Sequence, residues 1–455
     1  MIYRYATVSV LGFVLTIIWM GHAPYLHDFG EWVFQSKILT LHWSDPEQVT
    51  GFQWATYPVP NSLAILIMAI FGLAIPAITA AKLFLTILLA GWFFVLRKFV
   101  RQLCSSTDYD ALVFILFSLV ALSNFFWTGF VSYQLGLLLL TLFLTRFGPS
   151  MRAAELATLA VLIFLSHAMV FLVFVLLVLL DTVHSNKRLP RILALFPAGV
   201  LSLWFVIGRS LAEFSTPIAG AAMADWSEVI IYKLGYPLML GPFKSLLQPD
   251  LSSLLDHLPW FYWSGFIANV LVVSGVGIFI LLAIWSQQKT ATRMITRAGF
   301  SRSSLRISAS VLLLFYVIAP YNFFGLINPS GRVTIPLLLI SLLLLSSSTQ
   351  VAVSTRLLRA LAPIVLVFTF FTVFSYMMLM HRAETPEYLS NVAKQKNMPT
   401  GVSVLEYNTR VYSQARYNYF NYRIFGFSAR FTDIELEHYN RLGFRTALLV
   451  GFKEP

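Results

Sequence analysis

The chain has 455 residues, of which 58% are hydrophobic and only 11% are charged, and its mean hydropathy is +0.75. Soluble domains are closer to roughly 45–50% apolar and about 25% charged, so this composition argues against a water-soluble fold. The net charge of +12 would suggest a nucleic-acid partner in a soluble protein. Here basic loops facing the cytoplasm explain it, and we expect no nucleic acid among the partners.

The apolar runs are long and rich in Leu, Phe and Val, and they lack the strict alternation of a barrel strand. The single cysteine, Cys104, excludes an internal disulfide and a cysteine zinc cluster. We therefore expect an all-α polytopic membrane protein of the plasma (inner) membrane, with about eleven transmembrane helices.

The N-terminal segment could be read in two ways. Arg4 precedes an apolar stretch that ends at Met20, and Gly21-His22-Ala23 resembles a signal-peptide cleavage site. An uncleaved first helix over residues 6–21 is the preferred interpretation.

The next apolar segment, 61–75, is short. If it crossed the membrane, helix 80–97 would leave Arg97 and Lys98 outside, against the positive-inside rule. We expect 61–75 to lie in the interface without crossing.

Further along the chain, apolar stretches predict more helices, and the 154–182 stretch is too long for one untilted span. We divide it into two short spans with a turn near Ser166-His167. Asn124, Trp127, Tyr133 and Gln134 are read as an outer loop whose rings anchor at the interface. The remaining predicted helices are 110–123, 131–146, 192–208, 260–285, 307–326, 333–347 and 361–380.

This topology separates the charges. The predicted inner gaps contain sixteen Lys and Arg against four acids, whereas the outer gaps before the tail contain six Lys and Arg against nine acids. The N-terminus is then cytoplasmic and the C-terminus extracytoplasmic. Residues 1–380 form the transmembrane domain, with outer loops 22–60 and 209–259. Residues 381–455, rich in Tyr, Asn and Arg, are expected to form a small extracytoplasmic α/β module.

The first outer loop has the strongest candidate catalytic residues. Asp28 and Glu31 are three residues apart, and the spacing of apolar residues over 28–40 predicts a helix that lies on the membrane surface. Both carboxylates would share one face, where either could act as a general base towards an acceptor hydroxyl. The alternative is that they are simply the solvated face of an interfacial helix.

Other residues could bind substrate or a cation. Asp45 and Glu47 could hold a divalent cation such as Mg²⁺ or Mn²⁺, although such acidic pairs are common in loops. Lys82 and Arg332 could meet a phosphate at the outer leaflet, or could merely extend towards the headgroups. His167 is polar within a membrane segment, which indicates either function or the capping of backbone carbonyls at a turn.

The first hundred residues resemble the C-type (GT-C) glycosyltransferases that use polyprenyl-phosphate sugars. The resemblance lies in the order of the sequence elements along the chain. These are one span, His27-Asp28 with Glu31, the element Tyr57-Pro58-Val59-Pro60, a small-residue stretch around Lys82, and a returning span that ends in Arg97-Lys98. Weaker similarities are Ser166-His167-Ala168 and Gly331-Arg332. The resemblance implies Asp28 as the catalytic acidic residue, with Glu31 as its nearest rival, and Lys82, His167, Arg332 and Tyr57 as substrate-binding residues.

We therefore predict a membrane glycosyltransferase, a hexosyl- or pentosyltransferase. It would move a sugar from a polyprenyl-phosphate donor to an extracytoplasmic glycolipid, polysaccharide or protein, with membrane lipid as its other partner. The alternative is a non-catalytic transporter or flippase of a lipid-linked saccharide. A polysaccharide polymerase or ligase of another fold would need a large outer loop with paired arginines, whereas 209–259 contains only Arg209.

Overall fold

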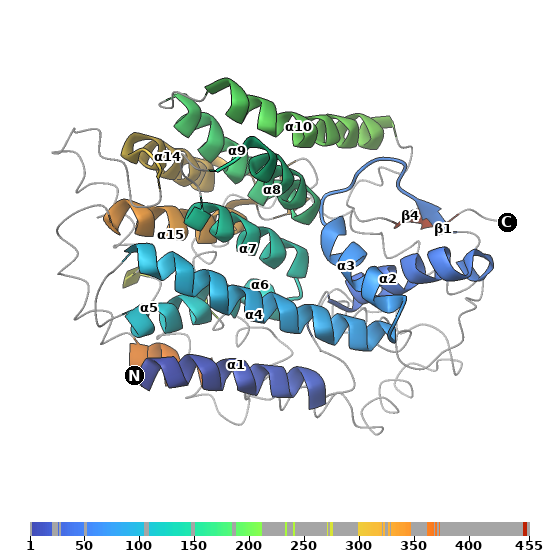
Figure 1. The fold of residues 1–455 in the computed structure, drawn as a ribbon, viewed down its shortest axis with the longest axis horizontal. Coiled ribbons are helices and arrows are strands. Elements are labelled where there is room, and N and C mark those ends of the chain that lie inside the picture. The colour runs from blue at the N-terminus through green and yellow to red at the C-terminus, as the bar shows by residue number, and fades with distance from the viewer. Residues whose placement is uncertain are drawn as a thin grey trace.

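The computed structural model describes residues 2–20, 26, 29–49, 52–103, 109–146, 151–183, 188–211, 233, 240–241, 271, 274–275, 299–320, 322–323, 326–327, 329–346, 362–367, 369–370, 373 and 449–452. These residues are mostly helical (Figure 1). The helices are α1 (Ile2–Met20), α2 (Phe29–Ser44), α3 (Ser62–Gly72), α4 (Ala77–Leu103), α5 (Tyr109–Leu116), α6 (Asn124–Trp127), α7 (Val131–Arg146), α8 (Ala153–Ser166), α9 (Ala168–Val183), α10 (Arg188–Leu211), α14 (Arg302–Ile318) and α15 (Pro329–Ser346). A 3-10 turn, η1 (Pro46–Val49), and a π-helical turn, η2 (Phe117–Ala121), are further helical elements, and residues 362–367 are helical as well.

Three of these helices are long and apolar enough to cross a membrane: Ile2–Met20, Ala77–Leu103 and Arg188–Ser210. Several shorter apolar helices pack beside them. The chain is thus an all-α membrane protein in class. The number of about eleven spans and the C-terminal α/β module stay predictions, because most of residues 260–285 and most of the tail lie outside the described residues.

The first two long helices are antiparallel neighbours. At the end of α1, Trp19 Nε1 donates a hydrogen bond to Thr86 Oγ1 near the start of α4, at 3.0 Å. Lys82 Nζ of α4 donates to the carbonyl oxygen of Trp19, at 3.3 Å. The intervening segment therefore starts and ends at one end of the molecule, where Figure 1 shows α2 and α3 side by side. Helix α3 has 11 residues, about 16 Å, which is too short for a hydrocarbon core of about 30 Å.

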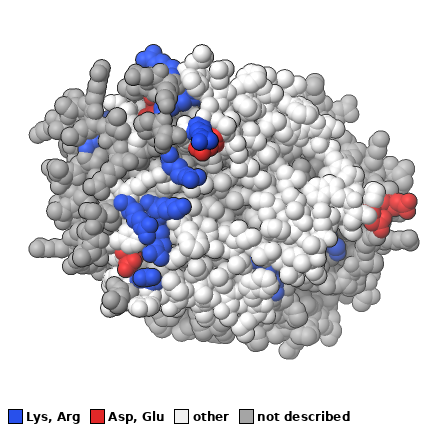
Figure 2. Space-filling view, in the orientation of Figure 1, with Lys and Arg blue, Asp and Glu red and all other residues white. Residues whose placement is uncertain are grey.

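Lys and Arg are concentrated towards one end of the long axis of the molecule (Figure 2). The starts of α10 and α14 meet the end of α9, where Asp181 accepts from Arg191 Nη1 at 2.6 Å and from the backbone nitrogen of Ser301 at 3.0 Å. Lys and Arg gather at this end with a few acidic atoms among them, an acidic cluster lies at the opposite end, and the face between is mostly uncharged (Figure 2). The described basic residues that begin or end helices here are Arg4, Arg97, Lys98, Arg101, Arg146, Arg152, Arg188, Arg191, Arg302 and Arg306.

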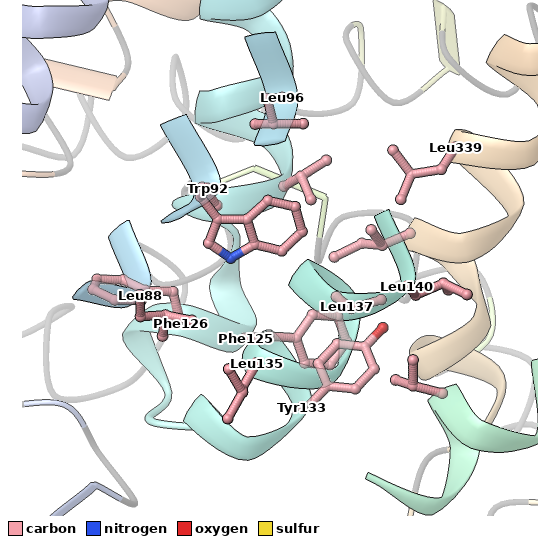
Figure 3. Close-up of a cluster of buried hydrophobic side chains, with 14 of the residues drawn as sticks. Leu88, Trp92, Leu96, Phe125, Phe126, Tyr133, Leu135, Leu137, Leu140 and Leu339 are labelled. Atoms are coloured by element: carbon pink, nitrogen blue, oxygen red, sulfur yellow. The ribbon is translucent and has the colours of Figure 1, made fainter. Parts of the chain in front are cut away.

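The centre of the bundle is a close contact between α4, α7 and α15. Leu88, Trp92 and Leu96 of α4 face the leucines of α7, with Leu339 of α15 on the other side (Figure 3). Lipid tails are as apolar as leucine, so association here depends on tight packing rather than on escape from water. Helix α7 also approaches α8 and α9 closely at Gly136, where a Cβ would lie 3.4 Å from the Cβ atoms of Ser166, His167 and Val170.

Several predicted boundaries can now be checked. The break predicted at Ser166-His167 is confirmed, because His167 is extended (φ −166°, ψ 125°) between α8 and α9. The helix predicted over 307–326 is wrong at its end. Ala319 is extended because it precedes Pro320. Two short strands, β2 (Asn322–Phe323) and β3 (Leu326–Ile327), then pair antiparallel. Helix α15 begins at Pro329 rather than at 333, since proline suits the first position of a helix.

The end of the chain pairs with the first loop. Strand β1 (Phe52–Trp54) and strand β4 (Leu449–Phe452) are antiparallel, with Gln53 opposite Gly451. Residues 449–452 therefore lie at the same end of the molecule as α2 (Figure 1).

Candidate functional site

The helix expected over 28–40 exists as α2, but it does not lie on the surface with a broad solvated face. Every described side chain from Trp32 to Ser36 is buried, and Ile38 and Leu39 are buried as well. Trp32 Nε1 donates to the carbonyl oxygen of Gly129 at 3.1 Å. Thr40 Oγ1 donates to the carbonyl oxygen of Ala69 in α3 at 3.1 Å. The expectation of a surface helix is therefore corrected: contacts on both sides fix α2 inside the protein.

The two candidate acids are placed only in part. Asp28 lies outside the described residues, and Glu31 is described only as a backbone position in the first turn of α2. Gln35, one turn beyond position 31, is fully buried, and neither of its amide atoms has a hydrogen-bond partner. No sequence signal selected Gln35, because an isolated glutamine in an apolar stretch belongs to no motif.

Lys82 lies where α1 and α4 meet. Its side chain is 9% exposed. Besides its hydrogen bond to Trp19, its ammonium group lies 6.0 Å from the centroid of the Trp19 ring. The cation is therefore held between α1 and α4 at the end of the molecule that carries α2 and α3. This position is compatible with both roles expected for Lys82: a side chain that extends towards the lipid headgroups, and one that faces a bound anion.

Tyr57 and the acidic pair lie at the same end but not in one cluster. The Tyr57 ring packs against α10, 6.0 Å from the Phe205 ring, and a Cβ at Gly208 would come 2.5 Å from it. Burial raises the pKa of Tyr57, and the nearby positive charge of Arg209 opposes that shift. Asp45 follows α2, and Glu47 is exposed in η1. Among the described residues no three His, Cys, Asp or Glu side chains gather as metal ligands.

His167 and Arg332, both selected from the sequence, are brought into contact although 165 residues separate them. The guanidinium Nη1 of Arg332 donates to His167 Nε2, because an arginine side chain has no acceptor. Tyr133 OH donates to the carbonyl oxygen of Arg332 at 2.6 Å, and its ring meets the His167 ring edge-on at 5.0 Å. The Arg332 guanidinium also lies over the Phe130 ring, 5.3 Å from its centroid.

The segment 124–134, interpreted from the sequence as an outer loop with interfacial rings, is buried instead. Asn124, Trp127, Tyr133 and Gln134 are each at most 3% exposed. Gln134 Nε2 donates to the carbonyl oxygen of Val120 at 3.1 Å and to Ser123 Oγ at 2.7 Å. The π-helical turn η2 precedes this segment, and such turns recur near functional sites. The aromatic residues had suggested a membrane interface, but they fill the bundle.

No family model, curated protein or solved structure matches this chain.

Proposed function

We propose that this protein is a membrane glycosyltransferase of the C-type (GT-C) class. It moves a sugar from a polyprenyl-phosphate carrier to an extracytoplasmic acceptor, which is a glycolipid, a polysaccharide or a protein. The observation that carries the proposal is the arrangement of α1 and α4. They are antiparallel neighbours, and the two helices between them are collected at the end of the molecule away from the basic residues.

The charge distribution supports an orientation. Basic residues mark the cytoplasmic ends of membrane helices. The end with Arg97, Arg146 and Arg191 is then cytoplasmic, and the first loop faces the exterior of the plasma membrane. The N-terminus is cytoplasmic under this proposal. The pairing of β4 with β1 favours an extracytoplasmic position for residues 449–452, beside the first loop.

The proposed reaction is a direct displacement at the anomeric carbon. The carboxylate of Asp28, or of Glu31 as its rival, accepts the proton of the acceptor hydroxyl while that oxygen bonds to the anomeric carbon. The bond from this carbon to the phosphate oxygen breaks, and the lipid phosphate leaves with the electron pair. Positive groups near the leaving oxygens stabilise the charge that develops. Lys82 and Arg332 are the proposed groups, and no step is assigned to a metal.

The test is sugar transfer by the full chain in proteoliposomes. We expect Asp28→Asn to abolish formation of the glycosidic bond, while the protein still inserts and folds. Glu155→Gln is the matched control, because Glu155 is an exposed acid at the basic end. Full activity in both Asp28→Asn and Glu31→Gln would contradict the assignment to the first loop. Translocation of the lipid-linked sugar without a new glycosidic bond would instead identify a flippase.

A further inference from the structure

Two residues of the segment between α10 and α14 lie inside the bundle. Leu240 and Gly241 belong to the segment 209–259, which the sequence predicts to be an outer loop. Leu240 is nevertheless 3% exposed and is part of the main apolar core. Gly241 is also buried, and its backbone is left-handed (φ 82°), a conformation that favours glycine. Such burial is unlike that of a loop on the surface of a protein.

Gly241 completes the backbone hydrogen bonding where the helix of α5 and η2 is interrupted. Leu122 N donates to the Phe117 carbonyl oxygen at 3.0 Å, which is the bond of a π turn. Continuing that five-residue pattern would join Asn124 N to the Leu119 carbonyl oxygen. Gly241 lies between them instead. Its N–H donates to the Leu119 carbonyl oxygen, and its own carbonyl oxygen accepts from Asn124 N, both at 2.9 Å.

This contact lies within the depth of a membrane. Tyr109, at the start of α5, is at the basic end, where its hydroxyl donates to the Arg97 carbonyl oxygen at 2.9 Å. Leu119 is about 15 Å further along the helical path, at 1.5 Å per residue. The hydrocarbon core of a bilayer is about 30 Å thick. With the basic end at one membrane surface, Gly241 therefore lies about halfway across the membrane.

Lys233, earlier in the same segment, makes a second contact with the bundle. Tyr316 OH donates to the Lys233 carbonyl oxygen, and Lys233 Nζ donates to the carbonyl oxygen of Val317. Both partners lie in the last turn of α14, about 22 Å from the start of that helix at the basic end. On these helix lengths the segment is deeper in the membrane at Gly241 than at Lys233, by about 7 Å.

We propose that residues 240 and 241 form a re-entrant pin, which reaches the membrane interior and holds the interrupted hairpin of α5, η2 and α6 closed. Non-helical backbone at membrane depth persists only where its polar groups are satisfied within the protein or by water. Gly241 satisfies one carbonyl and one N–H of the interruption. The pin also fixes the start of α7, because the Phe125 ring of α6 packs 4.7 Å from the Tyr133 ring. The proposal does not depend on the transfer reaction.

The first experiment measures how fast N-ethylmaleimide labels a cysteine at position 240 in the purified full chain, with Cys104 replaced. The reference is Trp43→Cys, because Trp43 is 45% exposed. We expect Leu240→Cys to react at least about tenfold more slowly, since labelling there requires local opening of the bundle. Equal rates at the two positions would overturn the proposal, because a residue in an exposed outer loop is not protected.

Asn124→Pro, combined with Leu240→Cys, tests the hydrogen bond that defines the pin. Asn124 is the first residue of α6, a position that suits proline, and the preceding Ser123 is extended, as a following proline requires. The substitution therefore removes the N–H that donates to Gly241 without opposing the helix start. Asn124→Ala is the matched control, because it removes the same side chain and keeps the N–H.

We expect Asn124→Pro to raise the labelling rate at position 240 at least about tenfold, and Asn124→Ala to change it less than about twofold. Equal rates in the two variants would contradict the pin. A glycine pair keeps the test decisive if circular dichroism shows that Asn124→Pro does not fold.

Gly241→Ala strains the left-handed backbone of the pin, whereas a Cβ at Gly12 of α1 meets nothing within 4 Å. We expect Gly241→Ala to lower the midpoint of thermal unfolding and to raise labelling at position 240. Gly12→Ala should do neither, and the absence of a difference between the two glycine variants would overturn the proposal.

Discussion

The buried carboxylate of Asp181 offers a direct test of how the basic end is held together. It is 4% exposed, and it receives hydrogen bonds from Arg191 and from the backbone of Ser301. The substitution Asp181→Ala would remove the carboxylate that accepts from the Arg191 guanidinium and from the backbone N–H of Ser301. Removing one partner of a buried ion pair costs about 3–5 kcal/mol.

The lower end of that range is expected here. The Arg191 side chain is 13% exposed, so water can reach part of it after the substitution. We therefore predict that Asp181→Ala lowers the free energy of unfolding by about 3 kcal/mol. Asp181→Asn should cost less, because the amide oxygen can still accept from Ser301. The measurement is unfolding of the detergent-solubilised protein by SDS, followed by circular dichroism.

A double-mutant cycle separates the ion pair from other effects. Combining Asp181→Ala with Arg191→Ala should cost less than the sum of the two single substitutions, since the pair is lost only once. Glu155→Ala is a control at the same end, where the side chain is exposed. If Asp181→Ala unfolds at the same SDS concentration as the original chain, the reasoning that Asp181 joins α9, α10 and α14 is refuted.

Three further predictions concern the opposite end. Gly72→Ala should destabilise the contact between α2 and α3, because a Cβ at position 72 would lie 2.6 Å from Thr40 Oγ1. The measurement is the midpoint of thermal unfolding, and an unchanged midpoint would contradict the prediction. The raised pKa of Tyr57 means that the folded protein holds this proton more tightly than the unfolded chain, so its stability falls as pH rises above the ordinary tyrosine pKa of about 10. Unfolding from pH 9 to 12 should therefore show a smaller loss in Tyr57→Phe than in the original chain, and identical profiles would oppose this. Cysteines at 53 and 451, in a background without the native thiol, should form a disulfide under mild oxidation, whereas no cross-link would contradict the pairing of β1 with β4.

Local signals predicted much of the fold. The break before α9 followed from the length of the apolar stretch and from its polar residues, and α7 was predicted with the bounds that the structure has. The end of α14 was missed because the apolar pattern continues beyond Pro320, whereas Pro320 disfavours a helical conformation at Ala319, which is extended. Periodicity alone does not reveal such a stop.

The candidate site was less predictable. The sequence selected His167 and Arg332 individually, as polar residues in apolar surroundings. Their contact depends on how α9 and α15 pack, and no local pattern contains that information. Tyr133 and Gln134 were interpreted as part of an outer loop because aromatic rings beside polar residues are typical of a membrane interface. Their hydrogen bonds to buried backbone and side-chain atoms reverse that interpretation.

The central claim, that the first loop faces the exterior, is tested most directly by labelling single cysteines in intact cells. Positions 43 and 98 are suitable, because Trp43 and Lys98 are exposed at opposite ends of the molecule. With Cys104 replaced, a membrane-impermeant maleimide should label cysteine at 43 in intact cells, and at 98 only after permeabilisation. The reverse pattern would place α2 and α3 in the cytoplasm and contradict the account.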